Sequence, residues 1–187
     1  MPPKVKITQQ DIVQAAIALV RTGGAVALNA RAVATALGCS TQPIFSNFRT
    51  MEELQEATIA AAYELYLSFI KREVESAVYP PYKAMGMAYV RFAAEEKELF
   101  KLLFMRDRTG EDLSAGPDFE QSVQMICKAG GLSEERARLL HLETWSAVHG
   151  IGVMLATSFL PLTEAQISAM LSDVYLALRA RHKEEGK

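Results

Sequence analysis

Residues 29–48, NARAVATALGCSTQPIFSNF, decide the fold that the sequence predicts. Asn29 is suited to begin a helix, because its side-chain oxygen can accept from free backbone N–H groups of the first turn. Gly38 is suited to end that helix, because glycine adopts left-handed backbone angles without a Cβ clash. Ser40 then provides a second N-terminal cap, and Pro43 still falls in the first turn of the next helix, where its missing N–H is not needed. Two short helices joined by a glycine turn are typical of the helix-turn-helix, whose second helix enters the major groove of DNA.

The sequence on both sides of this stretch favours the same interpretation. From Thr8 to Leu54 the chain resembles the DNA-binding domain of TetR-type transcriptional regulators, nearly without gaps. The matching segments are ITQQDIVQAAIALVRTGG, VALNARAVATALGCS and PIFSNFRTMEEL. The resemblance implies a three-helix DNA-binding domain in residues 1–50, followed by a second domain in residues 51–187. The pattern alone would also fit a helical hairpin in some other bundle.

The composition is that of an ordinary globular protein, with half of the 187 residues hydrophobic and 22% charged. No apolar run is long enough to span a bilayer, and the N-terminal MPPKVKITQQ lacks the apolar core of a signal peptide. We therefore expect a cytoplasmic protein with no membrane partner. Cys39 and Cys127 have no metal-ligand spacing, so we interpret them as small hydrophobic residues in a reducing compartment.

The net charge of −2 is unevenly distributed along the chain. Up to Met51 there are five basic residues and one acidic residue, whereas the remainder holds 15 basic and 21 acidic residues. The N-terminal part is therefore +4 and the remainder −6. This asymmetry is expected when only the N-terminal part meets phosphate.

Seven residues are predicted to contact DNA: Asn29, Arg31, Thr41, Gln42, Phe45, Asn47 and Arg49. Thr41 and Gln42 begin the second helix of the motif, and Gln can bond an adenine edge in two places. Asn29 and Arg31 can donate to phosphates near the start of the first helix. Gln42 and Asn47 could equally be solvated surface amides, and Arg31 could pair with a carboxylate of its own chain.

The resemblance assigns further roles in the same segment. Phe45 and Asn47 stand where TetR-type regulators usually carry a tyrosine and a histidine that contact phosphate. Phe45 keeps the ring without the hydroxyl, and Asn47 keeps a donor. Met51 stands where TetR-type regulators often carry a lysine that contacts phosphate. Arg49 could supply that phosphate contact instead. The resemblance also implies that Phe48 packs inward while Phe45 lies near the DNA backbone.

The rest of the chain predicts an all-α protein of about nine helices. A long helix from about residue 50 to Val78 is expected to join the DNA-binding domain to a helical ligand-binding and dimerisation domain, with Pro80-Pro81 ending it. Two further long helices, about 133–159 and 163–181, carry apolar stripes, so we expect a homodimer through them, as the resemblance also implies. Both helices could instead merely close the core of one chain. The stripes are Leu139, Leu142, Ser146, Gly150 and Val153, and Ile167, Met170, Leu171, Val174 and Leu178.

Glycines within the first of these two helices are unfavourable by about 1 kcal/mol each relative to alanine. Gly150 and Gly152 are therefore expected to permit the close approach of another backbone.

The second domain carries its own resemblance. Trp145, His149 and Gly150 resemble the tryptophan–histidine–glycine (WHG) signature of one C-terminal type among TetR-like regulators, and residues 89–105 fit the same group. Such domains generally sense a small molecule that releases the protein from DNA. The residues predicted to line the effector site of this chain are mostly apolar, which favours a hydrophobic or aromatic effector. The same residues could instead simply be part of the core. The candidate lining is Met85, Tyr89, Phe92, Phe104, Trp145 and His149.

The sequence offers no basis for catalysis or for a cofactor. The three histidines and two cysteines show no nucleophile–base spacing and no metal motif, and no glycine-rich phosphate loop is present. We therefore expect a non-enzymatic, TetR-like regulator that binds a near-palindromic operator as a dimer, most of whose relatives repress. The alternative is a helical small-molecule-binding or scaffold protein without sequence-specific DNA binding.

Overall fold

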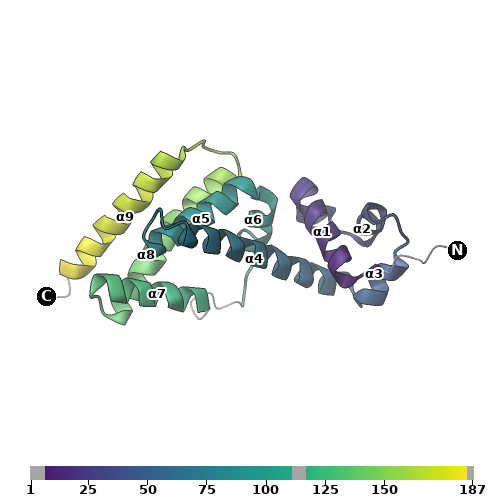
Figure 1. Ribbon diagram of the computed structural model, residues 1–187, viewed down its shortest axis with the longest axis horizontal. Coiled ribbons are helices and arrows are strands. Elements are labelled where there is room, and N and C mark those ends of the chain that lie inside the picture. Colours follow the sequence, from purple (N-terminus) through teal and green to yellow (C-terminus); the bar gives the residue numbers. More distant parts are fainter. Residues whose placement is uncertain (1–6, 111–116, 185–187) are drawn as a thin grey trace. The chain divides into compact units, whose positions relative to one another are not determined.

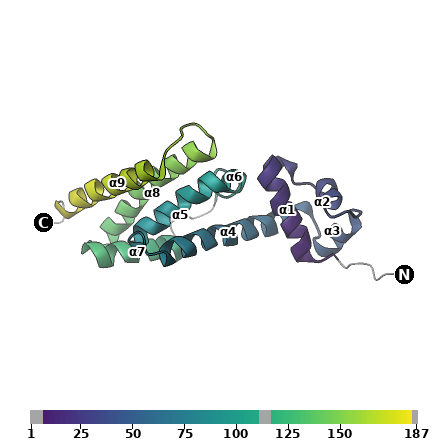
Figure 2. The same ribbon diagram turned by 45° about the horizontal axis from the view of Figure 1, so that its top comes forward.

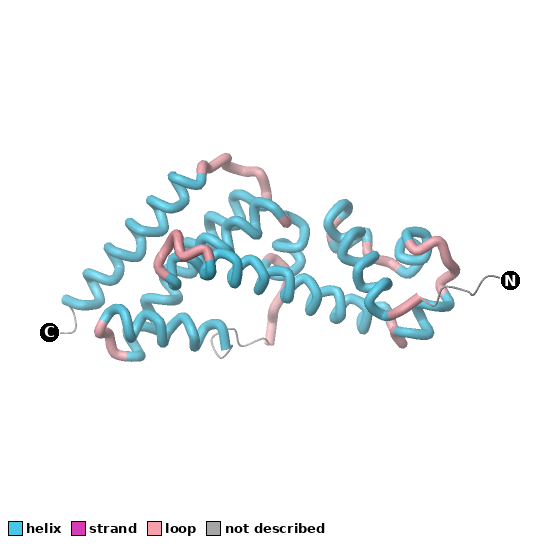
Figure 3. The backbone as a smooth tube through the Cα atoms, viewed as in Figure 1, coloured by secondary structure: helices cyan, strands magenta, loops and turns pink. Residues whose placement is uncertain are grey.

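The computed structural model describes residues 7–110 and 117–184, and within them the chain is all-helical, with nine α-helices and no strand (Figures 1 and 3). This confirms the predicted fold class. The chain divides into two compact units: residues 1–67 with 96–106, and residues 68–95 with 107–187. The predicted boundary at residue 50 therefore differs from the division between compact units. The helices are α1 (Gln9–Gly23), α2 (Ala30–Ala36), α3 (Gln42–Asn47), α4 (Met51–Glu75), α5 (Pro81–Glu95), α6 (Lys97–Phe104), α7 (Pro117–Gly130), α8 (Glu134–Ala156) and α9 (Glu164–Glu184), with a 3₁₀ turn at Ala25–Ala27.

The first unit packs α1, α2 and α3 around one small core, and Figure 2 shows these three helices gathered together. Helix α1 begins at a capping box, in which the Asp11 backbone N–H donates to Thr8 Oγ1 and the Thr8 backbone N–H donates to the Asp11 carboxylate. Gly24, with φ of +71°, ends it. The core consists of Ile12, Ala16, Val33, Ala34, Ile44, Phe48 and Leu54.

The turn between α2 and α3 follows the predicted glycine geometry. Asn29 caps α2 by accepting from the Ala32 N–H at 3.0 Å. Gly38 has φ of +64°, and the Cys39 N–H reaches back to the Ala34 carbonyl at 2.9 Å, which is the Schellman form of helix ending. The predicted cap at Ser40 is wrong, because Thr41 already has helical angles and is itself the N-cap.

Helix α4 contributes to both units, Met51–Leu67 to the first and Ser68–Glu75 to the second. It ends at Glu75, before the prolines that were expected to terminate it, and Pro81 instead begins α5. Its buried positions do not follow one continuous helical stripe. The buried positions are Leu54, Thr58, Ala62, Phe69 and Glu73, whereas Ala57, Ala61 and Leu65 are half-buried.

In the second unit α5 packs against α8 and α9, and α7 packs against α8. Helix α5 lies close to α8 and α9 at Gly86, where a Cβ would lie 3.4 Å from Leu171 and 3.6 Å from Val148. The expectation for Gly150 is not met within the described chain, since a Cβ there would have nothing within 4 Å. Gly150 lies on the exposed side of α8, which is why no neighbouring helix of its own chain reaches it.

The last two helices begin at side-chain caps and differ from the predicted ranges by a few residues at their ends. Ser133 accepts from the Arg136 N–H, and Thr163 forms a reciprocal box with Gln166. After α8 the chain turns at Ser158, with φ of +55°, and the Phe159 N–H donates to the Met154 carbonyl at 2.9 Å. The position of Phe159 is thereby tied to the end of the helix.

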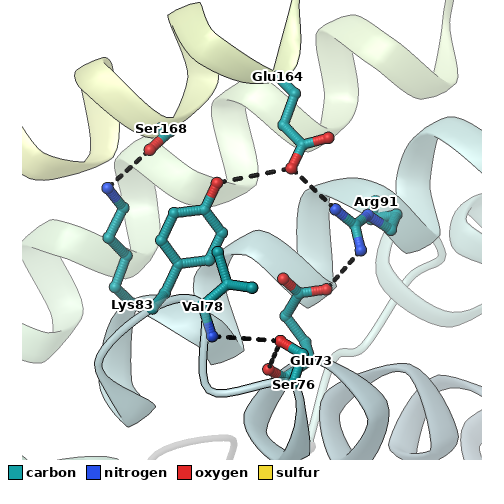
Figure 4. A network of polar contacts seen from close by, with 8 residues as sticks. Glu73, Ser76, Val78, Lys83, Arg91, Glu164 and Ser168 are labelled. Carbon is teal, nitrogen blue, oxygen red and sulfur yellow. Dashed lines mark hydrogen bonds and ion pairs between the residues drawn. The ribbon is translucent and has the colours of Figure 1, made fainter.

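A network of charged side chains joins three helices of the second unit (Figure 4). Arg91 of α5 pairs with the buried Glu73 at the end of α4 and, at 2.9 Å, with Glu164 at the start of α9. Lys83 of α5 donates to Ser168 and Ser172 of α9 at 2.7 and 2.8 Å.

None of the helices in residues 7–110 and 117–184 has the length and apolar character needed to span a membrane.

Candidate nucleic-acid interface and effector site

Helix α3 is mounted on the core of the first unit by one face and leaves the other face open. Ile44 and Phe48 are 1% and 3% exposed, whereas the Phe45 ring, on the other face, is 48% exposed. This inward position of Phe48 and outward position of Phe45 agree with the family resemblance. Gln42 is exposed and Thr41 is half-buried at the N-terminal end of the helix. The end of α3 that could meet base edges therefore presents Gln42 to solvent, with Phe45 one turn further on.

Asn47 is oriented by its own helix and by α1. Its side-chain amide donates to the Pro43 carbonyl at 2.8 Å, and its own carbonyl accepts from Gln9 Nε2 at 3.0 Å. Asn47 is therefore not the freely solvated amide considered above. Gln9 holds the end of α3 against α1, and the sequence alone gave no sign of this role, because a glutamine in the first turn of a helix has no distinctive pattern.

The two predicted phosphate ligands at the start of α2 differ in how they are held. Asn29 uses its oxygen as the α2 cap and donates its amide to the Ala27 carbonyl at 3.3 Å. Arg31 is exposed, and its guanidinium has no hydrogen bond or ion pair with any residue that the structure describes. The pairing of Arg31 with a carboxylate of its own chain is thus not found within residues 7–110 and 117–184, and its guanidinium is available to a phosphate.

Arg49 lies between α3 and α4 with a 90% exposed side chain. Its Nε lies 3.5 Å from Glu53, whose carboxylate also accepts from the Arg49 backbone N–H at 2.7 Å. An exposed ion pair of this length contributes little, so the guanidinium can exchange partners easily. Met51, at the position where a lysine is common, packs against the core instead.

The other basic residue described in the N-terminal segment is already neutralised. Arg21 of α1 makes two hydrogen bonds to the Glu96 carboxylate, at 2.7 and 2.8 Å, and this interaction raises the pKa of Arg21. Arg21 therefore joins α1 to the residue preceding α6 rather than extending the surface that could meet phosphate. Lys4 and Lys6, also counted in the basic N-terminal segment, lie outside the described residues.

In the second unit the structure brings together three of the six predicted effector-site residues. The Tyr89 hydroxyl lies 2.8 Å from His149 Nδ1, and the Trp145 ring stacks on His149 with 5.3 Å between centroids. Tyr89 is 3% exposed, and burial lowers the pKa of His149. The His149 imidazole, hydrogen-bonded to the buried Tyr89 phenol, is the polar pair within this aromatic cluster.

The remaining three predicted residues are not part of that contact. Phe92 is fully buried, with its ring edge-on to Phe69 at 5.3 Å, and Met85 is half-buried on α5. Phe104 belongs to the first unit, where its ring packs edge-on to Tyr66 at 5.2 Å. Sequence spacing could not separate Phe104 from the others, because α5 and α6 follow each other directly while belonging to different units.

A surface groove lies elsewhere on the second unit, between α7, α8 and the end of α9. It has a volume of about 610 Å³, and none of the six predicted effector-site residues lines it. Its lining is Phe119, Glu135, Arg136, Arg138, Leu139, Leu142 and His182. Across the described residues, no group of three or more His, Cys, Asp and Glu side chains is placed to hold a metal ion.

These features define an all-helical protein with an N-terminal helix-turn-helix and a larger helical second unit. Residues 82–175 match the sequence model of the tetracyclin repressor-like C-terminal domain, which is half of the chain. The chain therefore belongs to the TetR family of transcriptional regulators. No curated protein gives a significant match.

Solved structures share the same fold. A protein of unknown function from Rhodococcus sp. RHA1 aligns over 97% of both chains with a TM-score of 0.70 at 19% identity. A TetR-like transcriptional regulator from the same organism aligns over 100% of both chains, with a TM-score of 0.66 and 13% identity. A putative TetR-family regulator from Vibrio parahaemolyticus aligns over 90% of this chain and 97% of that one, with a TM-score of 0.61 at 18% identity.

Proposed function

We propose that the protein is a TetR-type repressor that binds a near-palindromic operator as a homodimer and is released by a small hydrophobic effector. The observation that carries the proposal is the surface around α3. The exposed Gln42 and Phe45 lie on a helix whose opposite face is anchored in the core by Ile44 and Phe48. A rigidly mounted helix with a solvated N-terminal end is what base-edge contact in the major groove requires.

Phosphate contact in this proposal comes from exposed donors on both sides of α3. Arg31 lies on α2 before it, and Arg49 lies after it. Phosphate contacts position the protein on the duplex, and contacts from Thr41 and Gln42 then distinguish base pairs. Asn47 and Asn29 retain one amide hydrogen each for a phosphate beyond the bonds they make within the chain.

Dimerisation in this proposal uses the last two helices. Leu139, Leu142, Ser146 and Gly150 all lie on the exposed side of α8, and Met170 of α9 is 39% exposed. Four of the five residues of the predicted α8 stripe are thus open to a partner chain, whereas Ile167 and Leu171 of the α9 stripe are buried within one chain. Two recognition helices related by a two-fold axis would read two half-sites one helical turn of DNA apart.

The effector is proposed to enter beside Trp145 and His149, consistent with the WHG-type signature that these residues resemble. The Tyr89–His149 pair offers one polar point among aromatic rings, so the effector is expected to be a largely apolar molecule with a single polar group. The place of action is proposed to be the cytoplasm.

The experiment is binding of the purified protein to labelled DNA from beside its own gene, compared with scrambled DNA over a salt series. Tight binding to the native fragment alone, weakening steeply with salt, supports sequence-specific regulation. A reporter gene behind that fragment then distinguishes repression from activation. Equal and weak binding to both fragments contradicts the proposal and favours a helical small-molecule-binding or scaffold protein.

A further inference from the structure

No contact within its own described chain explains why position 150 of α8 is a glycine. It lies inside α8, where glycine is unfavourable by about 1 kcal/mol relative to alanine. A Cβ at this position would meet nothing within 4 Å, so no described part of the chain requires the small residue. In contrast, Gly86 of the same unit has side chains from α8 and α9 close to it. A glycine on an exposed helix face fits the close approach of a backbone that belongs to another molecule.

Two apolar features flank Gly150 along the chain. Eight residues before it, Leu142 is 48% exposed and lines the groove together with Leu139 and Phe119. Nine residues after it, Phe159 is 79% exposed and is held at the end of α8 by its hydrogen bond to Met154. At 1.5 Å per residue, Leu142 lies about 12 Å before Gly150 along the helix, and α8 ends at Ala156, about 9 Å after it. Phe159 follows three residues later, in the turn that leaves the helix.

A two-fold axis makes this spacing significant. In a symmetric pair of antiparallel helices, a residue a given distance before the axis faces the partner residue the same distance after it. With the axis at Gly150, Leu142 faces the partner's chain just beyond the end of its α8, where the turn that carries Phe159 begins. The groove of one protomer then faces the exposed Phe159 of its partner, and the same contact is made a second time by symmetry.

We propose that the homodimer is formed with two copies of α8 crossing at Gly150, so that Phe159 of each protomer enters the groove lined by Phe119, Leu139 and Leu142 of the other. This inference rests on the proposed homodimer and specifies its register. The groove suits an aromatic guest, because its apolar floor is bordered by the charged side chains of Glu135, Arg136 and Arg138. A buried aromatic anchor surrounded by a polar rim is the arrangement that concentrates binding energy at protein interfaces.

The register is tested by cysteine pairing in a background in which Cys39 and Cys127 are replaced by alanine. Gly150→Cys is expected to form an intermolecular disulfide on mild oxidation, because a residue at the axis faces its own copy. A chain that carries both Leu142→Cys and Phe159→Cys is expected to form intermolecular disulfides that crosslink the dimer. A chain that carries only one of the two substitutions is expected to form no such crosslink. Lys128→Cys, at an exposed position on α7, is the control and is expected to stay monomeric under denaturing electrophoresis.

The anchor is tested separately by light scattering over a concentration series. Phe159→Ala is expected to raise the dimer dissociation constant at least about tenfold, with unchanged circular dichroism. Val78→Ala removes a comparably exposed apolar side chain from the turn between α4 and α5 and is expected to leave the constant unchanged. An unchanged constant in Phe159→Ala overturns the anchor.

The outcomes separate this inference from the proposed function. A protein that is monomeric at all concentrations overturns both the homodimer and its register. A dimer that does not crosslink through Gly150→Cys, or that crosslinks equally through Lys128→Cys, overturns the register while the homodimer stands. A small apolar molecule that fills the groove should compete with Phe159 of the partner. If such a molecule binds in the groove and the Phe159-dependent association persists, Phe159 is not the occupant of the groove.

Discussion

Arg31 is the side chain on which phosphate binding can be tested one residue at a time. It is exposed and makes no ion pair with the described residues, so its removal should not disturb the fold. Arg31→Ala is expected to weaken operator binding by about 1–2 kcal/mol and to reduce the slope of log K against log salt by about 0.9. Fluorescence anisotropy over a salt series measures both quantities.

The matched control for Arg31 is Lys128→Ala, which removes one exposed positive charge from α7 in the second unit. Equal effects of the two substitutions would show that Arg31 acts only through net charge and makes no phosphate contact.

His141 provides a prediction about pH. Its Nδ1 lies 2.9 Å from the Tyr82 hydroxyl, the Phe119 ring packs against it, and burial lowers its pKa from 6.5 to about 4. The unfolded chain therefore binds a proton more readily, so this contribution to stability is complete above pH 6.5 and is lost as the pH falls toward 4. His141→Gln is expected to remove up to about 2 kcal/mol of the difference in unfolding free energy between pH 7.5 and pH 5. Urea unfolding at the two pH values measures it.

If the variant loses as much stability on acidification as the original protein, protonation of His141 is not the cause. His149, whose pKa burial also lowers, would then be the next residue to replace.

At this scale the sequence predicted helix caps better than polar partners, because a cap depends only on residues within four positions. Asn29 caps its helix as expected, and the cap predicted at Ser40 is one residue early. The Gln9–Asn47 hydrogen bond joins residues 38 positions apart, so no local pattern could have indicated it.

Among the elements, the turn between α2 and α3 depends on the backbone angles of Gly38. Its φ is +64° and a Cβ would meet nothing within 4 Å, so a substitution there introduces backbone strain without a clash. Gly38→Ala is expected to lower the unfolding free energy by about 1–2 kcal/mol. Gly38→Asn, which tolerates these angles better, is expected to lose less. Thermal unfolding of the two variants side by side measures the difference, and equal losses would contradict strain as the cause.

The end of α4 is held by a buried charge. Glu73 is 4% exposed, and its carboxylate pairs with Arg91 of α5. Arg91→Met leaves that carboxylate without its main partner and is expected to destabilise the protein by about 3–5 kcal/mol. The double variant Glu73→Met with Arg91→Met removes both charges and is expected to recover most of the loss, as chemical unfolding can establish. A double variant as unstable as the single one would show that packing, and not the unpaired charge, is responsible.

Element boundaries show where periodicity was insufficient. The end of α4 was predicted from Pro80-Pro81, but the helix stops at Glu75, and Ala77 adopts left-handed angles. The buried positions of α4 also shift along the helix, because one end packs in the first unit and the other in the second. One continuous apolar stripe cannot describe a helix whose two ends pack in different units.

For the whole molecule, association of two chains should be visible in stability. Leu139 and Leu142 are each 48% exposed in one chain, and covering them in a dimer stabilises the folded state more strongly as the protein concentration rises. The midpoint of thermal unfolding is expected to rise with concentration, and Leu142→Glu is expected to abolish that rise. A midpoint that is independent of concentration in the original protein would argue against a homodimer.

The fold class of the whole molecule was predictable, whereas the extent of its units was not. The nine helices of residues 7–110 and 117–184, and the N-terminal helix-turn-helix, follow from local patterns and the family resemblance. The assignment of residues 96–106 to the first unit depends on contacts between α1 and α6, which are distant in sequence.

The ion pair between Arg21 and Glu96 has a consequence for how such proteins can be recombined. Because the first unit is assembled from two separate pieces of chain, it cannot be transplanted onto another body as one N-terminal fragment. A chimera joined at residue 50 would carry Arg21 of one parent and the acceptor position of the other. Exchange of DNA specificity between relatives should therefore succeed most often when the recipient keeps an acidic residue at the position of Glu96, or when that segment is exchanged as well.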